Sequence, residues 1–302
     1  PQAAHHFPRE EHAMTPPECP TTVTELPQGP VEYRWEQRGP RTVLMVHGGH
    51  MRASLPLGEE VFAQAGYSIL APSRPGYGRT PLRVGPGPAE FADVVAGLCH
   101  ELGITRLAAV VGQSAGGPTA VTLASRHPGL VERLILQSAV GLLPWPDRRT
   151  RLGGGVLFIP RTERAVWAIT HTLVRRAPRL ALRLLLRELT SRPAGTFVAG
   201  LAPEHRALLL GLFARMRSGA GFAADLRHLA RGTGQVPRVT QPTLVIASPD
   251  DGAVPFAHAQ GLAAAIPGAQ LVTSRAPSHF IWLGEDYPDI ELSITRFLRG
   301  TL

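Results

Sequence analysis

Ser114 lies in a G-x-S-x-G motif, residues 112–116, whose residue types and spacing suggest nucleophilic chemistry. The apolar run 106–111 precedes the motif and the helix-like segment 119–124 follows it. A G-x-S-x-G motif between a buried strand and a helix is typical of a nucleophile elbow, a tight turn that exposes its serine. The two glycines suit such a turn because they have no Cβ atom to collide with neighbouring backbone. A serine hydroxyl is a poor nucleophile alone, so the chain must also supply a base, an acid and an oxyanion site.

The candidate base is His279, one of twelve histidines. It lies in the loop between the last predicted strand, 269–273, and the last predicted helix, 288–298. In an open parallel sheet this loop is at the carboxyl edge, where such sheets bind ligands. Most of the other histidines fall in the N-terminal tail or on predicted helices. A loop histidine can also simply face solvent, so the assignment depends on the residues around it.

The candidate acid is Asp250 or Asp251, in the loop that follows the predicted strand 242–247. The resulting order Ser, Asp, His along the chain is the order associated with this type of elbow. Both aspartates also fit an ordinary Pro-Asp-Asp-Gly turn. The competing position after the strand 131–136 holds Gln-Ser-Ala and no carboxylate. The acid is therefore expected at 250 or 251.

The candidate oxyanion site is the turn His47-Gly48-Gly49-His50, which follows the predicted strand 42–46. Backbone N–H groups of such a glycine turn can act together with the N–H of the residue after the nucleophile. Two histidines without a regularly spaced Asp, Glu or Cys make a poor metal signature, so no metal is expected. The chain has no lysine, which excludes a Gly-rich phosphate loop with a lysine, and no cofactor is expected.

Alternating strands and helices are expected to position these residues. The pattern predicts an α/β fold with a mostly parallel central sheet and helices on both faces. The 302 residues, 44% of them hydrophobic, are enough for a sizeable core. The predicted strands cover 21–26, 31–35, 42–46, 67–71, 106–111, 131–136, 242–247 and 269–273. The predicted helices of this part cover 59–65, 89–102, 119–124, 256–265 and 288–298.

Residues 141–240 differ from the rest of the chain in composition and periodicity. They hold 17 arginines and 5 acidic residues, and they contain three predicted amphipathic helices, 163–175, 179–192 and 204–217. This composition boundary predicts a helical insertion at 141–240 in a core formed by 21–140 and 241–302. Residues 1–20 are polar and proline-rich and are expected to form a flexible tail.

The surface of the insertion is strongly basic. Arg179, Arg183 and Arg187 recur every four residues, which places them on one helix face. This face is interpreted either as a basic surface for anionic lipid or acidic substrates, or as an ordinary solvated face. Apolar residues of the insertion are expected to form the roof of an acyl pocket: Leu142, Leu143, Trp145, Phe158, Trp167 and Phe213.

Neither a membrane-spanning helix nor a secretory signal is found in the sequence. No run approaches the roughly 18 apolar residues that a spanning helix needs. Cys19 and Cys99 are the only cysteines, so no disulfide framework is implied. We therefore expect a cytoplasmic protein with a small-molecule substrate and no nucleic-acid partner, with peripheral membrane contact through the basic insertion left open.

With these motifs in place, the chain resembles the α/β-hydrolase superfamily from about Thr21 to Leu302. The resemblance implies that Asp251, three residues before a Val-Pro pair, is the acid rather than Asp250. It also implies Gly49 and Ala115 as oxyanion donors, and a helical cap at 141–240. The segments that carry the resemblance are His47-Gly48-Gly49, 74–80, 112–117, 251–255 and Ser278-His279-Phe280.

Several positions depart from the pattern of this superfamily. Ser73 stands where many members have Asp, Ser248 replaces a Gly, and Ala276-Pro277-Ser278 replaces the usual Gly before the histidine. Serine at 114 argues against a haloalkane dehalogenase or an epoxide hydrolase, which use Asp there. His50 argues against a proline iminopeptidase.

The predicted function is that of a serine hydrolase acting on carboxylic esters of small to medium acyl size. Ser114, His279 and Asp251 would form its catalytic triad. One alternative keeps the triad but acts on carbon–carbon bonds, thioesters or peracids, as relatives in the superfamily do. Another is a ligand receptor that retains the fold without turnover.

Overall fold

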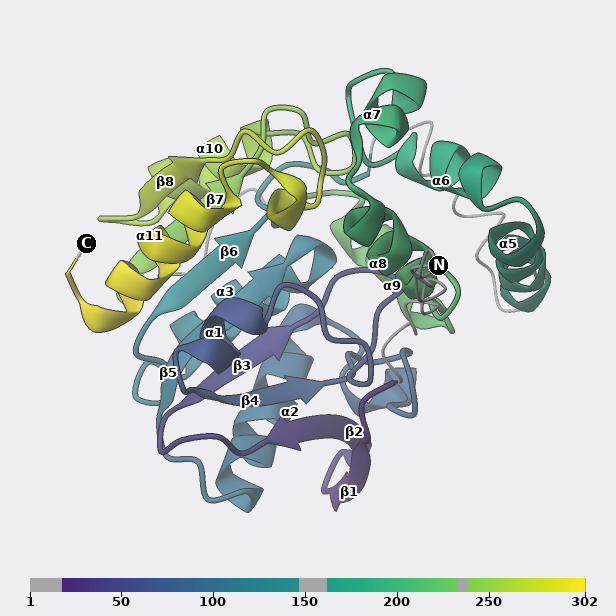
Figure 1. Ribbon diagram of the computed structural model, residues 1–302. Coiled ribbons are helices and arrows are strands. Elements are labelled where there is room, and N and C mark those ends of the chain that lie inside the picture. The colour runs from purple at the N-terminus through teal and green to yellow at the C-terminus, as the bar shows by residue number, and fades with distance from the viewer. Residues whose placement is uncertain (1–17, 147–161, 233–237, 302) are drawn as a thin grey trace, which may run out of the picture.

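The computed structural model describes residues 18–146, 162–232 and 238–301, and within them eight strands form one sheet (Figure 1). The strand order is β1-β2-β4-β3-β5-β6-β7-β8. All neighbours from β4 to β8 pair in parallel, whereas β2 is antiparallel to both β1 and β4. The strands are β1 (Thr22–Leu26), β2 (Gly29–Glu36), β3 (Thr42–Val46), β4 (Ser68–Pro72), β5 (Leu107–Gln113), β6 (Leu134–Gln137), β7 (Thr243–Ala247) and β8 (Gln270–Thr273).

Helices cover both faces of the sheet, which confirms the predicted fold class (Figure 1). On one face Val110 of β5 belongs to the same core as residues of α2, α3 and α10. On the other face Val111 belongs to a core with residues of α1 and α11. Because both faces are covered, consecutive residues of a central strand are buried, and the strand reads as a continuous apolar run. These helices are α1 (Glu60–Gln64), α2 (Pro88–Glu101), α3 (Gly117–Arg126), α10 (Ala257–Ala265) and α11 (Tyr287–Arg299), with short 3₁₀ turns at Leu82–Val84, Ser114–Gly116 and Ile281–Leu283.

Five further helices come between β6 and β7 in the described part of the chain and lie together at one end of the sheet (Figure 1). Their core includes Trp167, Leu182 and Phe213, together with Met51 after β3 and Phe280 after β8. These helices therefore pack on loops at the carboxyl edge of the sheet. They are α5 (Glu163–Arg176), α6 (Pro178–Leu186), α7 (Ala194–Gly200), α8 (Pro203–Phe213) and α9 (Gly221–Leu229).

Some predicted boundaries are wrong. The helix predicted over 179–192 ends at Leu186, because the residues that follow are held by loops of the sheet edge, and Thr190 forms a β-bridge with Asp251. The strand predicted from Val131 begins at Leu134, and Val131 makes only an isolated bridge with Leu107. Helices α7 and α9 were not predicted.

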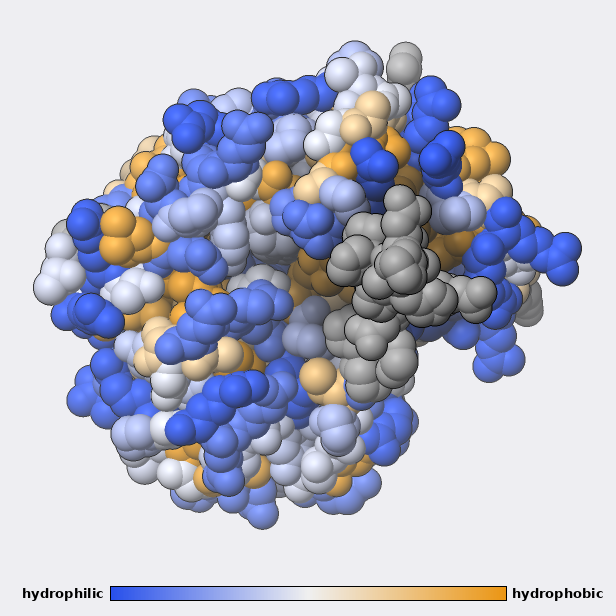
Figure 2. All heavy atoms as spheres, viewed as in Figure 1, coloured by the Kyte–Doolittle hydropathy of each residue, from blue (hydrophilic) through white to orange (hydrophobic). Residues whose placement is uncertain are grey.

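Helix α6 exposes Arg179 and Arg183 and buries Leu182 and Leu186, and Arg187, just past the end of the helix, is exposed as well. Leu180 and Leu184 are also exposed on this helix, each at 49%. Figure 2 shows hydrophobic and hydrophilic side chains next to one another over this part of the molecule. No helix of the described ranges is both long and apolar enough to cross a membrane. Most of the predicted tail (residues 1–17) and the predicted roof residue Phe158 lie outside the described residues.

Candidate functional site

Ser114 occupies a strained turn at the carboxyl end of β5. Its φ is +49°, a left-handed value that few residues other than glycine adopt. The turn leads from β5 through a single 3₁₀ turn into α3, which is the strand–turn–helix context that the sequence predicted. Strained backbone of this kind persists only where the surrounding structure holds it, and it is concentrated at functional sites.

The glycines on either side of Ser114 are required by close approach. A Cβ on Gly116 would lie 2.2 Å from the Val46 carbonyl oxygen, and one on Gly112 would lie 2.7 Å from Ala120 Cβ. Backbone of β3 and the Ala120 side chain of α3 therefore pack directly against the elbow. A Cβ on Gly48 would lie 3.6 Å from Ser114 Oγ, so the predicted oxyanion turn passes beside the serine hydroxyl.

His279 is hydrogen-bonded to Asp251, with Nδ1 and Oδ2 2.7 Å apart. Because an ionised carboxylate only accepts, Nδ1 must donate this bond, which leaves Nε2 as the acceptor nitrogen of a neutral ring. Asp251 Oδ1 accepts the N–H groups of Ala253 and Val254, both at 2.8 Å. The Asp251 side chain has no exposed surface. Loop backbone and carboxylate thus fix the orientation of the imidazole.

Asp250 takes no part in this pair. Its carboxylate binds Arg192 at 2.5 Å on the surface, with side chains that are 32% and 52% exposed. The two neighbouring aspartates therefore have different roles in the fold: one orients a histidine and the other holds an exposed arginine.

Residues 138–140 connect the elbow with the histidine loop. Ser138, at the end of β6, donates its hydroxyl to the His279 carbonyl at 2.8 Å and has a left-handed φ of +46°. Val140 N–H donates to the Ser114 carbonyl at 2.9 Å. Among the described residues, Ser114 Oγ makes no hydrogen bond with His279. Catalytic hydrogen bonds commonly tighten only when substrate is bound, so the arrangement remains compatible with proton transfer.

Of the predicted oxyanion residues, Gly49 lies beside Phe222 of α9, and Ala115 lies in the hydrophobic cluster that contains Phe222. A Cβ on Gly49 would lie 3.0 Å from the Phe222 ring, and Ala115 belongs to the same buried cluster as Phe222. Trp145 is also in this cluster, and its indole N–H donates to the Ala253 carbonyl at 2.7 Å. The residue after Ser114 is therefore part of a cluster that contains aromatic side chains.

His47 holds the predicted oxyanion turn through both ring nitrogens. Its Nδ1 donates to the Gly48 carbonyl at 2.7 Å, and its Nε2 accepts the Arg74 N–H at 2.9 Å. Only the neutral ring can do both, and burial together with the nearby Arg74 guanidinium lowers the His47 pKa well below its usual range. Arg74 in turn forms a two-point ion pair with Asp225 of α9, at 2.7 and 2.8 Å. This chain of contacts couples the inserted helices to the predicted oxyanion turn.

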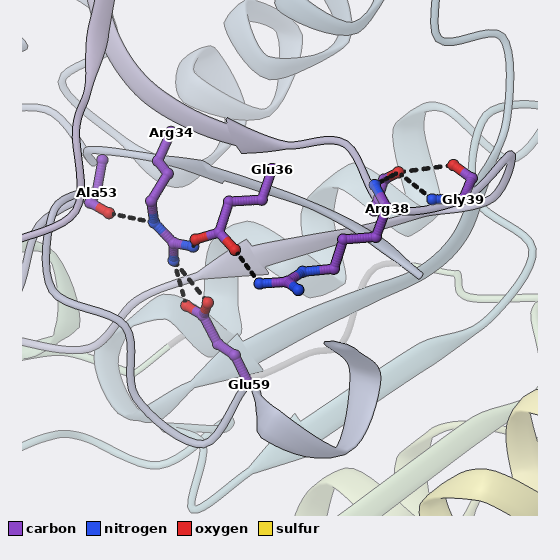
Figure 3. A network of polar contacts seen from close by, with 7 residues as sticks. Arg34, Glu36, Arg38, Gly39, Ala53 and Glu59 are labelled. Carbon is purple, nitrogen blue, oxygen red and sulfur yellow. Dashed lines mark hydrogen bonds and ion pairs between the residues drawn. The ribbon is translucent and has the colours of Figure 1, made fainter. Parts of the chain in front are cut away.

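The far end of the same loop is fixed by Arg34 of β2 (Figure 3). Its Nε donates to the Ala53 carbonyl at 2.9 Å, and its Nη2 binds both oxygens of Glu59 at 2.8 and 2.6 Å. Figure 3 also shows Glu36 bridging Arg34 and Arg38. Burial raises the Glu59 pKa to about 7 despite the adjacent Arg34. Arg34 therefore holds the loop between β3 and α1 against β2.

His50, the last residue of the predicted oxyanion turn, is held between aromatic rings. Its ring centroid lies 4.0 Å from that of Phe222 and 5.4 Å from that of Trp167, and its Nδ1 is 2.7 Å from Ser218 Oγ. Burial lowers the pKa of His50 from 6.5 to about 4. The ring is thus neutral near pH 7.

We expect His50 to make the protein less stable in acid. Between pH 6.5 and about 4 the unfolded chain binds a proton at His50 that the folded chain does not, so the free energy of unfolding falls as the pH is lowered through this window. The effect reaches about 3 kcal/mol at full extent. Urea unfolding at a series of pH values should therefore show a shallower acid dependence for His50→Asn, since Asn tolerates a left-handed backbone and has a neutral side chain. An acid dependence of His50→Asn equal to that of the wild type would contradict this expectation.

Several residues of this site were not predicted from the sequence. Ser138, Thr190, Phe222 and Asp225 act through contacts with residues far away in the chain. The one local signal was composition: Asp225 is one of five acidic residues in the basic segment 141–240. The contact partners of Ser138, Thr190, Phe222 and Asp225 can be identified only in the folded chain.

Comparison with known proteins gives consistent matches over most of the chain. The profile of a family described as alpha/beta hydrolase fold matches residues 41–286. An uncharacterised hydrolase of Bacillus subtilis, YcgS, is 32% identical over 276 residues, which are 90% of this chain and 96% of that protein. A 2-hydroxy-6-oxononadienedioate/2-hydroxy-6-oxononatrienedioate hydrolase of a Pseudomonas species is 28% identical over 244 residues, 77% of this chain and 79% of that protein. The solved structure of an alpha/beta hydrolase fold protein from Nakamurella multipartita superposes with a TM-score of 0.77 at 24% identity, covering 93% of this chain and 99% of that one.

Proposed function

The chain belongs to the α/β-hydrolase fold family, and from this premise we propose that it is a serine hydrolase of carboxylic esters with small to medium acyl groups. The observation that carries the proposal is the 2.7 Å hydrogen bond between His279 Nδ1 and Asp251 Oδ2, at the sheet edge where Ser114 has its left-handed turn. A carboxylate bound to one imidazole nitrogen leaves the other free to accept the proton of a serine.

In the proposed reaction His279 Nε2 removes the proton of Ser114 Oγ while Oγ bonds to the ester carbonyl carbon. The carbonyl electron pair moves onto oxygen, where the N–H groups of Gly49 and Ala115 stabilise the negative charge. As the intermediate collapses, the bond from the carbonyl carbon to the alcohol oxygen breaks, and the alcohol takes the proton from His279. Water, deprotonated by the same ring, then releases the acid and restores the Ser114 hydroxyl. Asp251 keeps the ring oriented and stabilises its cationic form throughout.

We further assign the cover of the substrate site to the inserted helices, as a cap of residues 141–240 on a core of 21–140 and 241–302. The support is that Phe222 of α9 packs beside Gly49 and shares a buried cluster with Ala115, and that Asp225 of the same helix is bound to Arg74, just after β4. An acyl group at Ser114 would therefore meet aromatic side chains, which suits an apolar chain better than a charged one.

A second candidate is hydrolysis of a carbon–carbon bond with the same three residues. It is favoured by the Pseudomonas relative, whose name gives it activity on 2-hydroxy-6-oxononadienedioate. Thioesters and peracids would need the same nucleophile, base and acid. These reactions differ in substrate recognition and in the group that leaves.

A panel of acyl substrates separates the candidates. We expect the wild type to hydrolyse p-nitrophenyl acetate and butyrate at least 100-fold faster, by kcat/KM, than 2-hydroxy-6-oxononadienedioate, with Ser114→Ala measured beside it on every substrate. The reverse preference, lost in Ser114→Ala, would assign the carbon–carbon reaction instead. Equal rates for wild type and Ser114→Ala on all substrates would contradict both the ester and the carbon–carbon candidate. The remaining hypothesis would then be a ligand receptor with this fold.

A further inference from the structure

A short segment after α6, residues 189–192, runs back onto the sheet edge, and we call it the strap. It binds both loops of the proposed acid–base pair, although its sequence belongs to the inserted helical region. Thr190 is only 6% exposed and forms an antiparallel bridge with Asp251. These contacts end α6 at Leu186 instead of at the predicted residue 192.

On the histidine side, the strap makes two short hydrogen bonds. The His279 backbone N–H donates to the Leu189 carbonyl at 2.7 Å. The Thr190 hydroxyl donates to the Pro277 carbonyl at 2.6 Å. Pro277 and His279 both lie in the loop 274–280. The backbone that carries the His279 imidazole is therefore held by a segment that is not part of the sheet.

On the acid side, the strap binds the residues that flank Asp251. The Ser191 N–H donates to the Asp250 carbonyl at 2.9 Å, and the Gly252 N–H donates to the Leu189 carbonyl at 3.3 Å. The Leu189 carbonyl therefore accepts from both loops at once. The exposed ion pair between Arg192 and Asp250 adds little, because ion pairs in solvent contribute about 0–1 kcal/mol.

The strap lies so close to the loop of Asp251 that position 252 in this loop requires a glycine. A Cβ on Gly252 would lie 2.6–2.7 Å from backbone atoms of Thr190, which cannot swing aside as a side chain can. The φ of Gly252 is outside the left-handed range, so alanine would meet no conformational barrier there. An alanine at position 252 therefore tests the steric contact with the strap.

We propose that the strap is a positioning element for the proposed acid–base pair: by holding the Asp251 and His279 loops at one carbonyl, it sets the hydrogen bond between His279 Nδ1 and Asp251 Oδ2. The proposal rests on the proposed function for its kinetic consequence, but its structural consequence does not depend on turnover. According to this proposal, the imidazole of His279 is correctly oriented only when the inserted helices are packed against the sheet edge. The residues concerned act through His279 and Asp251 and do not touch substrate.

The first test replaces Gly252 with alanine and uses Gly261→Ala as the matched control, since a Cβ at Gly261 meets nothing within 4 Å. We expect Gly252→Ala to lower kcat/KM for p-nitrophenyl butyrate about 100-fold, because displacements of about 1 Å at a catalytic group have effects of this size. Gly261→Ala should stay within twofold of the wild type. Thermal unfolding of both variants shows whether they are folded.

The second test changes the strap itself. Thr190→Val loses the hydroxyl bond to Pro277 at nearly unchanged volume, whereas Thr190→Ser keeps it. We expect Thr190→Val to lower kcat/KM about tenfold and Thr190→Ser to restore most of that loss. This pair keeps the proposal testable if Gly252→Ala does not fold.

The decisive readout is the proton NMR signal of the hydrogen bond between His279 Nδ1 and Asp251, which lies far downfield of the amide region. It is recorded with Ser114→Ala as the background, so that no turnover is needed. We expect the signal to be lost or moved upfield in Gly252→Ala and Thr190→Val, and to be retained in the two controls. Folded Gly252→Ala and Thr190→Val proteins with an unchanged signal and unchanged rates would overturn the proposal. A changed signal in a chain whose wild type hydrolyses no ester would uphold the strap and contradict the proposed function.

Discussion

Ser114→Ala is expected to lower kcat for ester hydrolysis by about 10⁶-fold, the size of effect measured when the nucleophile of a serine hydrolase is removed. The reason is that the acyl-enzyme cannot form, and only binding and oxyanion stabilisation remain. Steady-state rates with p-nitrophenyl butyrate, measured on protein free of wild-type contamination, check this expectation. The loss should fall on kcat, because Oγ is needed for bond formation and contributes little to ground-state binding.

The matched control for this variant is Ser293→Ala. Ser293 lies on α11 and its hydroxyl donates to the Asp289 carbonyl at an exposed turn, away from the sheet edge. Its rates should equal those of the wild type. If Ser114→Ala also keeps a kcat within tenfold of the wild type, Ser114 is not the nucleophile.

Asp251→Asn is expected to lower kcat by about 10⁴-fold, as the corresponding change does in a serine protease triad. In the wild type Asp251 Oδ1 accepts two loop N–H groups and Oδ2 accepts the proton of His279 Nδ1. In the variant the amide oxygen remains with the loop donors, so the amide N–H₂ faces Nδ1. The imidazole must then carry its proton on Nε2, where it can no longer accept one from Ser114. Steady-state kcat with p-nitrophenyl butyrate, with the fold checked by circular dichroism, measures the effect.

The neighbouring aspartate supplies the control. Asp250→Asn removes a surface ion pair with Arg192 and leaves the bond from Asp251 to His279 untouched. Its kcat should stay within about twofold of the wild type, since exposed ion pairs contribute little. Equal losses at 250 and 251 would show that the loop as a whole, and not the carboxylate beside His279, sets the rate.

The regular part of this fold could be predicted from the sequence because its signals are local. Strand β3 was predicted with its observed bounds, since Thr42–Val46 is a short apolar run buried on both faces. Ser114, Asp251 and His279 each follow a predicted strand, so a parallel sheet had to bring them to one edge. The choice of Asp251 over Asp250 came from the resemblance to α/β hydrolases, and the contact with His279 is consistent with it. The catalytic roles themselves remain predictions.

The contacts between the inserted helices and the sheet could not be predicted, because they are set by distant partners. The periodicity of Arg179, Arg183 and Arg187 continues past Leu186, yet the chain leaves the helix there to bind the loops of Asp251 and His279. In the sequence, position 138 was considered only as a site for the acid, which it excludes because it has no carboxylate. In the structure the Ser138 hydroxyl donates to the His279 carbonyl. Local propensity gave no indication of either contact, since tertiary hydrogen bonds override it.

The inserted helices are tied to the proposed machinery at two places. Asp225 of α9 binds Arg74, which holds His47 of the proposed oxyanion turn, and the strap binds the loops of Asp251 and His279. A shift of these helices would therefore reach both the oxyanion turn and the acid–base pair. Substrate binding under the helices and competence for chemistry are expected to be linked in this protein.

The central claim, that Ser114 is a nucleophile activated by His279 and Asp251, is tested most directly by covalent labelling. The wild-type protein is incubated with a fluorophosphonate, and the adduct is located by intact-mass and peptide mass spectrometry. The account predicts one adduct per chain on Ser114, none in Ser114→Ala, and labelling slowed by orders of magnitude in Asp251→Asn. An unlabelled wild-type protein, or an adduct on any other residue, would contradict it.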